Sequence, residues 1–184
     1  MPKWGKTDLK QLKALEQRLA QLEKAGFDKS LHETANKIAQ ILLNKSKKRT
    51  PVGVKPKLDG PKTINVKGTS GKTYKVLSKT GAIYDKYWSG YVGGTLRDAW
   101  EVKVTKESDH YLITLMNPTE YASYVEYGHR QTPGRYVPAL GKTLKASWVK
   151  GKLMMTISVQ EVEVLIPQML QNVVYQVLKE VFDA

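Results

Sequence analysis

The sequence of 184 residues contains no cysteine, only two phenylalanines, and no long uninterrupted run of apolar residues. The absence of cysteine excludes disulfide bonds, thiol nucleophiles and zinc sites built on sulfur. Because no run reaches about 18 apolar residues, we expect no transmembrane helix. The first residues pass directly into charged sequence without the apolar centre of a signal peptide. We therefore expect a protein that acts in the cytoplasm where it is made, or that leaves inside an assembly.

The sequence is also poor in groupings that carry catalysis. Its three histidines, His32, His110 and His129, are far apart, and none has a neighbour at the spacing of a helical metal site. The acidic residues form no clear catalytic pair. We predict no enzymatic activity, no metal and no cofactor. A small hydrolase or nuclease remains the alternative, and it would depend on His110 or His129.

One segment imitates a phosphate-binding loop. The sequence from Gly68 to Thr73 ends in Gly-Lys-Thr, but the P-loop pattern requires a glycine five residues before the second glycine, and Val66 stands there. No buried strand precedes the segment and no helical pattern follows it. We predict a turn between two extended pieces.

The net charge of +13 is concentrated in residues 45–79, which hold eleven basic residues and a single acid, Asp59. The rest of the chain is nearly balanced. Such a stretch either solubilises an exposed loop or binds phosphates, so a nucleic-acid-binding module is the alternative function. The candidate residues facing DNA or a channel are Lys45, Lys47, Lys48, Arg49, Lys55, Lys57, Lys62, Lys67 and Lys72.

Apolar spacing predicts helices at both ends of the chain. A helix over 7–24 carries a leucine seam, and a second runs from Asp28 or Ser30, with a Ser30–Glu33 capping box, until Pro51 ends it. Helices are also predicted over 153–163 and 167–182. The seam either packs on its own domain or contacts another subunit. The candidate subunit-interface residues are Leu12, Leu15, Leu19, Leu22, Val174, Val177, Leu178 and Val181.

The middle of the chain has the pattern of short strands. Alternation predicts an antiparallel hairpin of strands 96–104 and 111–116, and extended pieces at 64–66 and 74–77. A short helix over 120–127 should end at Gly128. The predicted fold is α+β, a small antiparallel sheet packed by helices. The predicted parts are an N-terminal helix (1–26), an α+β domain (27–150) with a long basic insertion (51–92), and a C-terminal helical extension (151–184).

Three segments together suggest a family. They are Arg49-Thr50-Pro51-Val52-Gly53 after a helix, Gly93-Gly94-Thr95-Leu96-Arg97-Asp98-Ala99-Trp100, and Asn117-Pro118-Thr119-Glu120-Tyr121-Ala122-Ser123-Tyr124-Val125-Glu126-Tyr127-Gly128-His129. In this order they resemble the head–tail joining, or tail-completion, proteins of tailed phages and defective prophages. In those proteins the first two segments are a few residues apart, whereas here some 40 residues separate them. The motif residues are Pro51, Gly94, Leu96, Trp100, Tyr121, Ala122, Val125, Glu126 and Gly128.

The resemblance implies a structural role and no catalysis. It implies a homo-oligomeric ring, with a hexamer as the expected size, at the neck or collar of a virion or phage-tail-like particle assembled in the bacterial cytoplasm. The implied partners are other neck, connector and tail-tube or terminator proteins, together with non-specific contact to translocating DNA. No membrane is implied.

Overall fold

The computed structural model describes residues 13, 16–18, 20, 26–58 and 60–182, which form two compact units that interleave along the chain. Unit 1 contains the described parts of Met1–Lys45, Glu101–Met116 and Ile157–Ala184. Unit 2 contains Ser46–Trp100 and Asn117–Thr156. The units group segments that are distant in sequence, so they differ from the three consecutive parts that we expected.

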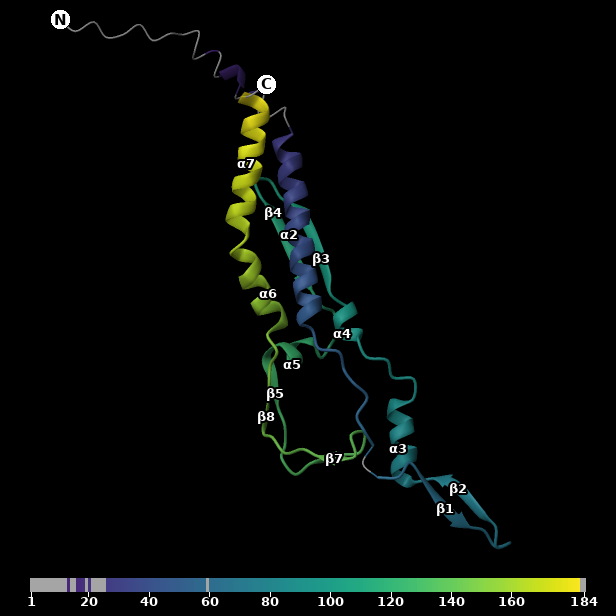
Figure 1. Ribbon diagram of the computed structural model, residues 1–184. Coiled ribbons are helices and arrows are strands. Elements are labelled where there is room, and N and C mark those ends of the chain that lie inside the picture. Colours follow the sequence, from purple (N-terminus) through teal and green to yellow (C-terminus); the bar gives the residue numbers. More distant parts are fainter. Residues whose placement is uncertain (1–12, 14–15, 19, 21–25, 59, 183–184) are drawn as a thin grey trace, which may run out of the picture. The chain divides into compact units, whose positions relative to one another are not determined.

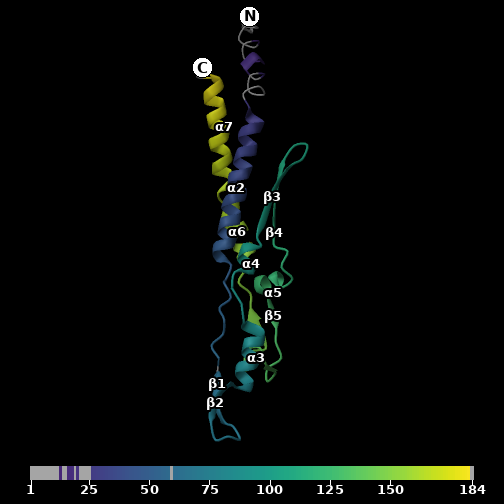
Figure 2. The same cartoon turned by 90° about the vertical axis from the view of Figure 1, so that its right-hand side faces the viewer.

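Unit 1 is built on helix α2 (Phe27–Arg49), which ends in unit 2. It also holds the hairpin of β3 (Glu101–Lys106) and β4 (Tyr111–Met116), most of α6 (Met154–Glu163), which begins in unit 2, and α7 (Ile166–Phe182). Figure 2 shows α2 between α7 and the β3–β4 hairpin. These bounds agree with the predicted helices over 28–48, 153–163 and 167–182 and with the predicted hairpin.

The core of unit 1 lies where these elements meet. Ile38 and Leu42 of α2 and Val162 of α6 are its buried centre. The hairpin has one apolar face because side chains alternate along a strand and Val104 pairs with Ile113. This face packs on the buried centre. The surrounding, partly buried side chains are Ile41, Ile113, Leu115, Val159, Ile166 and Met169.

Unit 2 consists of short elements, which Figure 1 shows together. They are β1 (Thr63–Lys67), β2 (Thr73–Leu77), α3 (Lys79–Trp88), α4 (Thr95–Asp98), α5 (Ala122–Tyr127), β5 (Gly128–Arg130), β6 (Tyr136–Val137), β7 (Lys142–Thr143) and β8 (Trp148–Lys150). The strands pair antiparallel as β1–β2, β5–β8 and β6–β7. The predicted α+β class is confirmed, although the described strands form separate two-stranded pairs in place of one small sheet.

Three local predictions were wrong. The first strand begins at Glu101, because residues 95–98 turn into α4, where the Ala99 amide donates to the Thr95 carbonyl at 3.0 Å. The capping box at Ser30 does not form, because α2 already begins at Phe27 and the Ser30 amide donates to Gly26 at 2.9 Å. Only extended pieces were predicted within the insertion, yet it also contains α3.

Candidate functional site

The first motif segment is held by a buried hydrogen-bonded junction around Thr50. The Thr50 hydroxyl donates to the Ser46 carbonyl at 2.7 Å and accepts from the indole Nε1 of Trp100 at 2.6 Å. The Thr50 carbonyl accepts from Arg97 Nε at 3.2 Å and from Nη2 at 2.9 Å. Trp100 is only 5% exposed, and Thr50 is fully buried. These four residues, Ser46, Thr50, Arg97 and Trp100, form what we call the Thr50 junction, which joins the first two motif segments.

The third motif segment is attached to the second through Asn117. Its amide Nδ2 donates to the Leu96 carbonyl at 2.8 Å, and its Oδ1 accepts from the Thr119 amide at 3.1 Å. Leu96 itself is buried within α4. The side chain of Asn117 therefore fixes where the chain turns into α5.

Glu126 is buried, only 4% exposed, and it caps another helix. Its carboxylate accepts from the amides of Met155 at 3.0 Å and Thr156 at 2.9 Å, and from the Thr156 hydroxyl at 2.8 Å. These amides belong to the first turn of α6, where unpaired N–H groups and the helix dipole favour a negative charge. Glu126 is therefore a helix cap, which explains how a charged side chain can be buried here.

Gly128 lets the same segment lie directly against β8. Its φ is +86°, and a Cβ atom there would lie 2.3 Å from the Val149 carbonyl oxygen. The Lys152 amide donates to the Val125 carbonyl at 2.8 Å. Any side chain at Gly128 would push these two backbones apart.

A surface pocket of about 380 Å³ lies beside the Thr50 junction. Most of its lining comes from the three motif segments, and the phenol-bearing Tyr91 and Tyr121 stay partly exposed at it. The lining residues are Pro51, Val52, Gly53, Tyr91, Gly94, Thr95, Leu96, Tyr121 and Val125. The motif residue Ala122, in the first turn of α5, does not line it. The pocket is mainly apolar, and the two phenols are the titratable side chains among its lining residues.

The two ends of the insertion meet at this pocket. A Cβ atom on Gly93 would lie 2.0 Å from the Gly53 carbonyl oxygen, so the two backbones are in close contact. An insertion whose ends touch can be added or removed without displacing the flanking segments. This explains how the first two motif segments can be adjacent in space while some 40 residues apart in sequence.

The insertion has internal contacts of its own. The Ser78 hydroxyl caps α3 by accepting from the Gly81 amide at 2.9 Å. It also donates to the Pro61 carbonyl at 2.7 Å. One contact leaves the insertion, because Trp88 Nε1 donates to the Ala139 carbonyl. Helix α3 was not predicted from the sequence, although Ser78 as an N-cap and the spacing of Tyr84 and Trp88 were available signals.

The candidate basic residues differ in their surroundings: some have partners, some lie outside the β1–β2 hairpin, and some belong to it. Lys45 is paired with Glu161 at 2.6 Å and Lys62 with Asp85 at 2.9 Å, while the ammonium of Lys55 lies 5.1 Å from the Tyr84 ring centre. Arg49 also has a partner. Lys47, Lys48 and Lys57 lie outside the β1–β2 hairpin. Lys67 ends β1 and Lys72 lies in the turn that follows, and the exposed Lys75 of β2 belongs with them although the sequence candidates omitted it.

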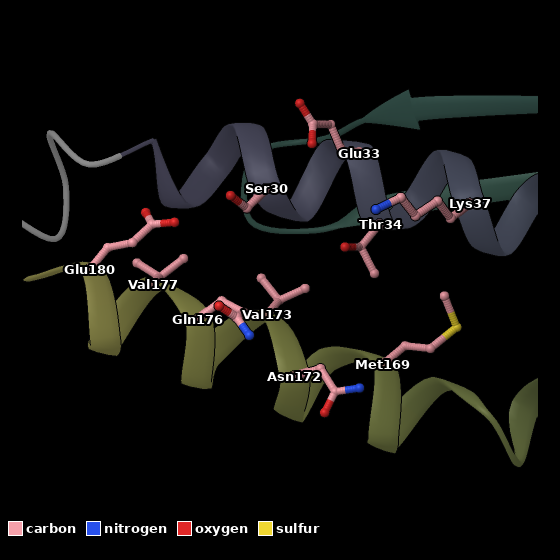
Figure 3. Close-up of a pocket in the computed structure, with 10 residues that line it drawn as sticks. All are labelled: Ser30, Glu33, Thr34, Lys37, Met169, Asn172, Val173, Gln176, Val177 and Glu180. Carbon is pink, nitrogen blue, oxygen red and sulfur yellow. The ribbon is translucent and has the colours of Figure 1, made fainter.

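The candidate interface residues also divide. The predicted leucine seam, Leu12, Leu15, Leu19 and Leu22, and the side chain of Val181 lie outside the described residues. Val174 and Leu178 of α7 are 42% and 40% exposed. Val177 is only 3% exposed, and it lines a groove of about 320 Å³ between α7 and α2. Figure 3 shows Val173, Val177 and Met169 pointing from α7 toward Ser30 and Thr34 of α2.

The part of the chain that the structure describes contains no cluster of three His, Asp or Glu side chains that could hold a metal ion. His110 lies against the exposed carboxylates of Asp109, at 2.7 Å, and Glu107, at 3.1 Å. The Gly68–Thr73 segment forms the turn of the β1–β2 hairpin, as predicted, with Thr73 as the first residue of β2. Within the described ranges, no helix combines the length and the apolar character needed to cross a bilayer.

Comparison with protein families accounts for the motif segments. The family model "Bacteriophage HK97-gp10, putative tail-component" matches residues 13–128. The match covers more than half of the chain and includes the Thr50 junction, Asn117 and Glu126. No match was found among the curated proteins or among the solved structures. The chain belongs to the HK97-gp10-like family of phage tail components.

Proposed function

We propose that the chain is a structural subunit that forms a ring, most simply a hexamer, at the neck or tail-completion interface of a phage particle. In this proposal the ring joins or caps the tail, and its neighbours are connector and tail-tube or terminator proteins. The role is steric and mechanical, without catalysis. Membership in a phage tail-component family supports a structural role in a phage tail.

The observation that carries the proposal is an apolar stripe on α7 that stays exposed among the described residues. Val173 and Val177 pack toward α2, whereas Leu170, Val174 and Leu178, at spacings of four, are exposed on the adjoining flank. An apolar stripe at helical spacing that no described residue covers is typical of a protein–protein contact.

A second exposed apolar surface lies on the β1–β2 hairpin. Its side chains are Ile64, Val66, Tyr74 and Val76. Two different apolar surfaces on one chain favour a head-to-tail contact, in which one surface meets the other on the next copy. Such a contact closes into a ring when the rotation between copies divides a full turn.

The proposal can be tested by measuring mass and assembly together. We expect the purified protein, alone or with its tail partners, to give a multiple of the 20.7 kDa chain in size-exclusion chromatography with light scattering, and ring-shaped particles by electron microscopy. The double variant Val174→Ser, Leu178→Ser should remain monomeric. The matched double variant Gln171→Ser, Lys179→Ser, on exposed polar positions of the same helix, should assemble normally.

Two results would contradict the proposal. One is a protein found neither in rings nor in recovered particles. The other is equal assembly of the wild type and the Val174→Ser, Leu178→Ser variant, because that would remove α7 from the contact.

A further inference from the structure

The β1–β2 hairpin has two chemically different faces. The register pairs Ile64 with Val76 and Asn65 with Lys75. Because side chains alternate along a strand, Ile64, Val66, Tyr74 and Val76 share one face, and Asn65, Lys67, Thr73 and Lys75 share the other. Lys72 lies in the turn, where its carbonyl accepts from the Gly68 amide at 2.8 Å, so it stands at the tip of the hairpin and not on this second face. We call Lys67 and Lys75, together with Lys72 at the tip, the lysine face.

The lysine face has no counter-charge within its reach in the hairpin. Residues 60–77 contain no aspartate or glutamate. Among the described residues, no ion pair or hydrogen bond involves the ammonium of Lys67, Lys72 or Lys75. This contrasts with Lys62, which is neutralised by Asp85 at the base of the same hairpin. Three like charges on a short ribbon repel one another, so an anionic partner would relieve that repulsion.

We propose that the lysine face binds the phosphate backbone of DNA. Lysine ammonium groups are point charges that suit phosphates, and DNA has the closely spaced charges that three neighbouring lysines require. The face offers only Asn65 as an amide that could read a base edge, so the binding should be independent of sequence. A two-stranded ribbon is also narrow enough to lie along a groove of duplex DNA.

The binding site is therefore smaller than the basic stretch 45–79 suggested by composition. Lys45 and Lys62 are engaged in ion pairs, and Lys55 lies over an aromatic ring. The inference does not depend on ring formation, because all three lysines belong to one hairpin of one chain. It concerns the lysines of the hairpin, whereas the ring proposal rests on α7 and on the apolar side chains of the same hairpin.

The test is the salt dependence of DNA binding by the full-length protein. Fluorescence anisotropy would follow a labelled mixed-sequence duplex and its single strand between about 50 and 200 mM NaCl. Three lost phosphate contacts should make the slope of log K against log salt shallower by about 2.7 on duplex and about 2.1 on single strand. The variant is Lys67→Gln, Lys72→Gln, Lys75→Gln.

The matched control is Lys29→Gln, Lys37→Gln, Lys103→Gln, which removes the same charge from exposed positions of unit 1. We expect its slope to stay at the wild-type value. Equal slopes for the two triple variants would overturn the proposal, because binding would then follow net charge alone. A polyglutamate chain bound as tightly as duplex DNA would also overturn it and indicate an acidic protein surface as the partner.

The same samples separate this inference from the ring proposal. Light scattering of the Lys67→Gln, Lys72→Gln, Lys75→Gln variant should give the wild-type mass, since none of these side chains lies on α7 or is one of the exposed apolar side chains of the hairpin. A loss of mass together with a loss of DNA binding would contradict the assignment of the lysine face to DNA.

Discussion

The Thr50 junction and the β1–β2 hairpin belong to the same unit but treat polar groups in opposite ways. The junction buries a threonine hydroxyl, an indole N–H and a carbonyl that all have partners, whereas the buried Ser46 hydroxyl has none among the described residues. The hairpin leaves its lysines and most of its apolar side chains exposed. Buried polar groups are costly unless they are paired, so the junction has one tolerated arrangement. The hairpin is held mainly by its strand pairing, so its exposed side chains can take part in a contact with another molecule.

Trp100→Ala should have the largest effect on stability. It removes a large buried side chain and leaves the Thr50 hydroxyl without its donor, so we expect the free energy of unfolding to fall by about 3–5 kcal/mol. Denaturant unfolding followed by circular dichroism measures this. Trp148→Ala is the control, since Trp148 is 53% exposed and its loss should cost far less. Similar losses for both would show that the junction is not a centre of stability.

Glu126→Ala should have the next largest effect. It leaves two amides of the first turn of α6 without an acceptor, which should lower the free energy of unfolding by about 2 kcal/mol. Glu120→Ala, at an exposed position just before α5, should be nearly neutral. Unchanged stability of Glu126→Ala would contradict the capping role.

Deletion of the β1–β2 hairpin should have only a small effect on the free energy of unfolding. The Ser78 amide donates to the Lys62 carbonyl at 2.9 Å, so the two ends of the hairpin are already paired. Replacing Thr63–Leu77 by Asn-Gly should therefore close the chain with a two-residue turn and change the free energy of unfolding by less than about 1 kcal/mol. DNA binding should weaken as in the triple lysine variant. A cooperative loss of structure would show that the hairpin supports the fold.

An exposed polar cluster in unit 1 should have the smallest effect on stability. Hydrogen bonds from Lys106 and Tyr111 hold the pKa of Asp28 below its ordinary 3.8, and the bond to Asp28 raises the pKa of Lys106 above 10.5. Burial, followed by the bond to Asp28, raises the pKa of Tyr111. The contribution of Asp28 should be present above pH 3.8 and be lost as the pH falls through the lowered pKa.

The contribution of Lys106 has the opposite sign with pH. It should be present below pH 10.5 and be lost as the pH rises through the raised pKa. Unfolding of Asp28→Asn should therefore differ slightly from that of the wild type across the neutral range and converge with it in acid. Because the ion pair is exposed, we expect a shift well below those of Trp100 and Glu126. Parallel pH curves of the two proteins down to strongly acidic pH would contradict this linkage.

Local patterns predicted the elements whose signals lie in neighbouring residues. The end of α2 at Arg49 follows from Pro51, and the β3–β4 hairpin follows from alternation. Helix α4 was predicted as strand because the predicted strand began at Leu96, although the alternation runs only from Trp100 to Val104, and the bonds that close around Gly94 and Thr95 make residues 95–98 a turn. Lys75 was missed because sequence shows a charge but does not show which face of a hairpin it shares.

The sequence by itself determined the family, the α+β class, the position of the excess charge and most of the helices. Each of these depends on residue type and on spacing over a few residues. Tertiary structure alone decided that Thr50 meets Arg97 and Trp100, that Glu126 caps α6, and that the insertion begins and ends at one point. These contacts join positions some 30 to 50 residues apart, and they depend on hydrogen-bond geometry in a buried environment, which no local pattern encodes.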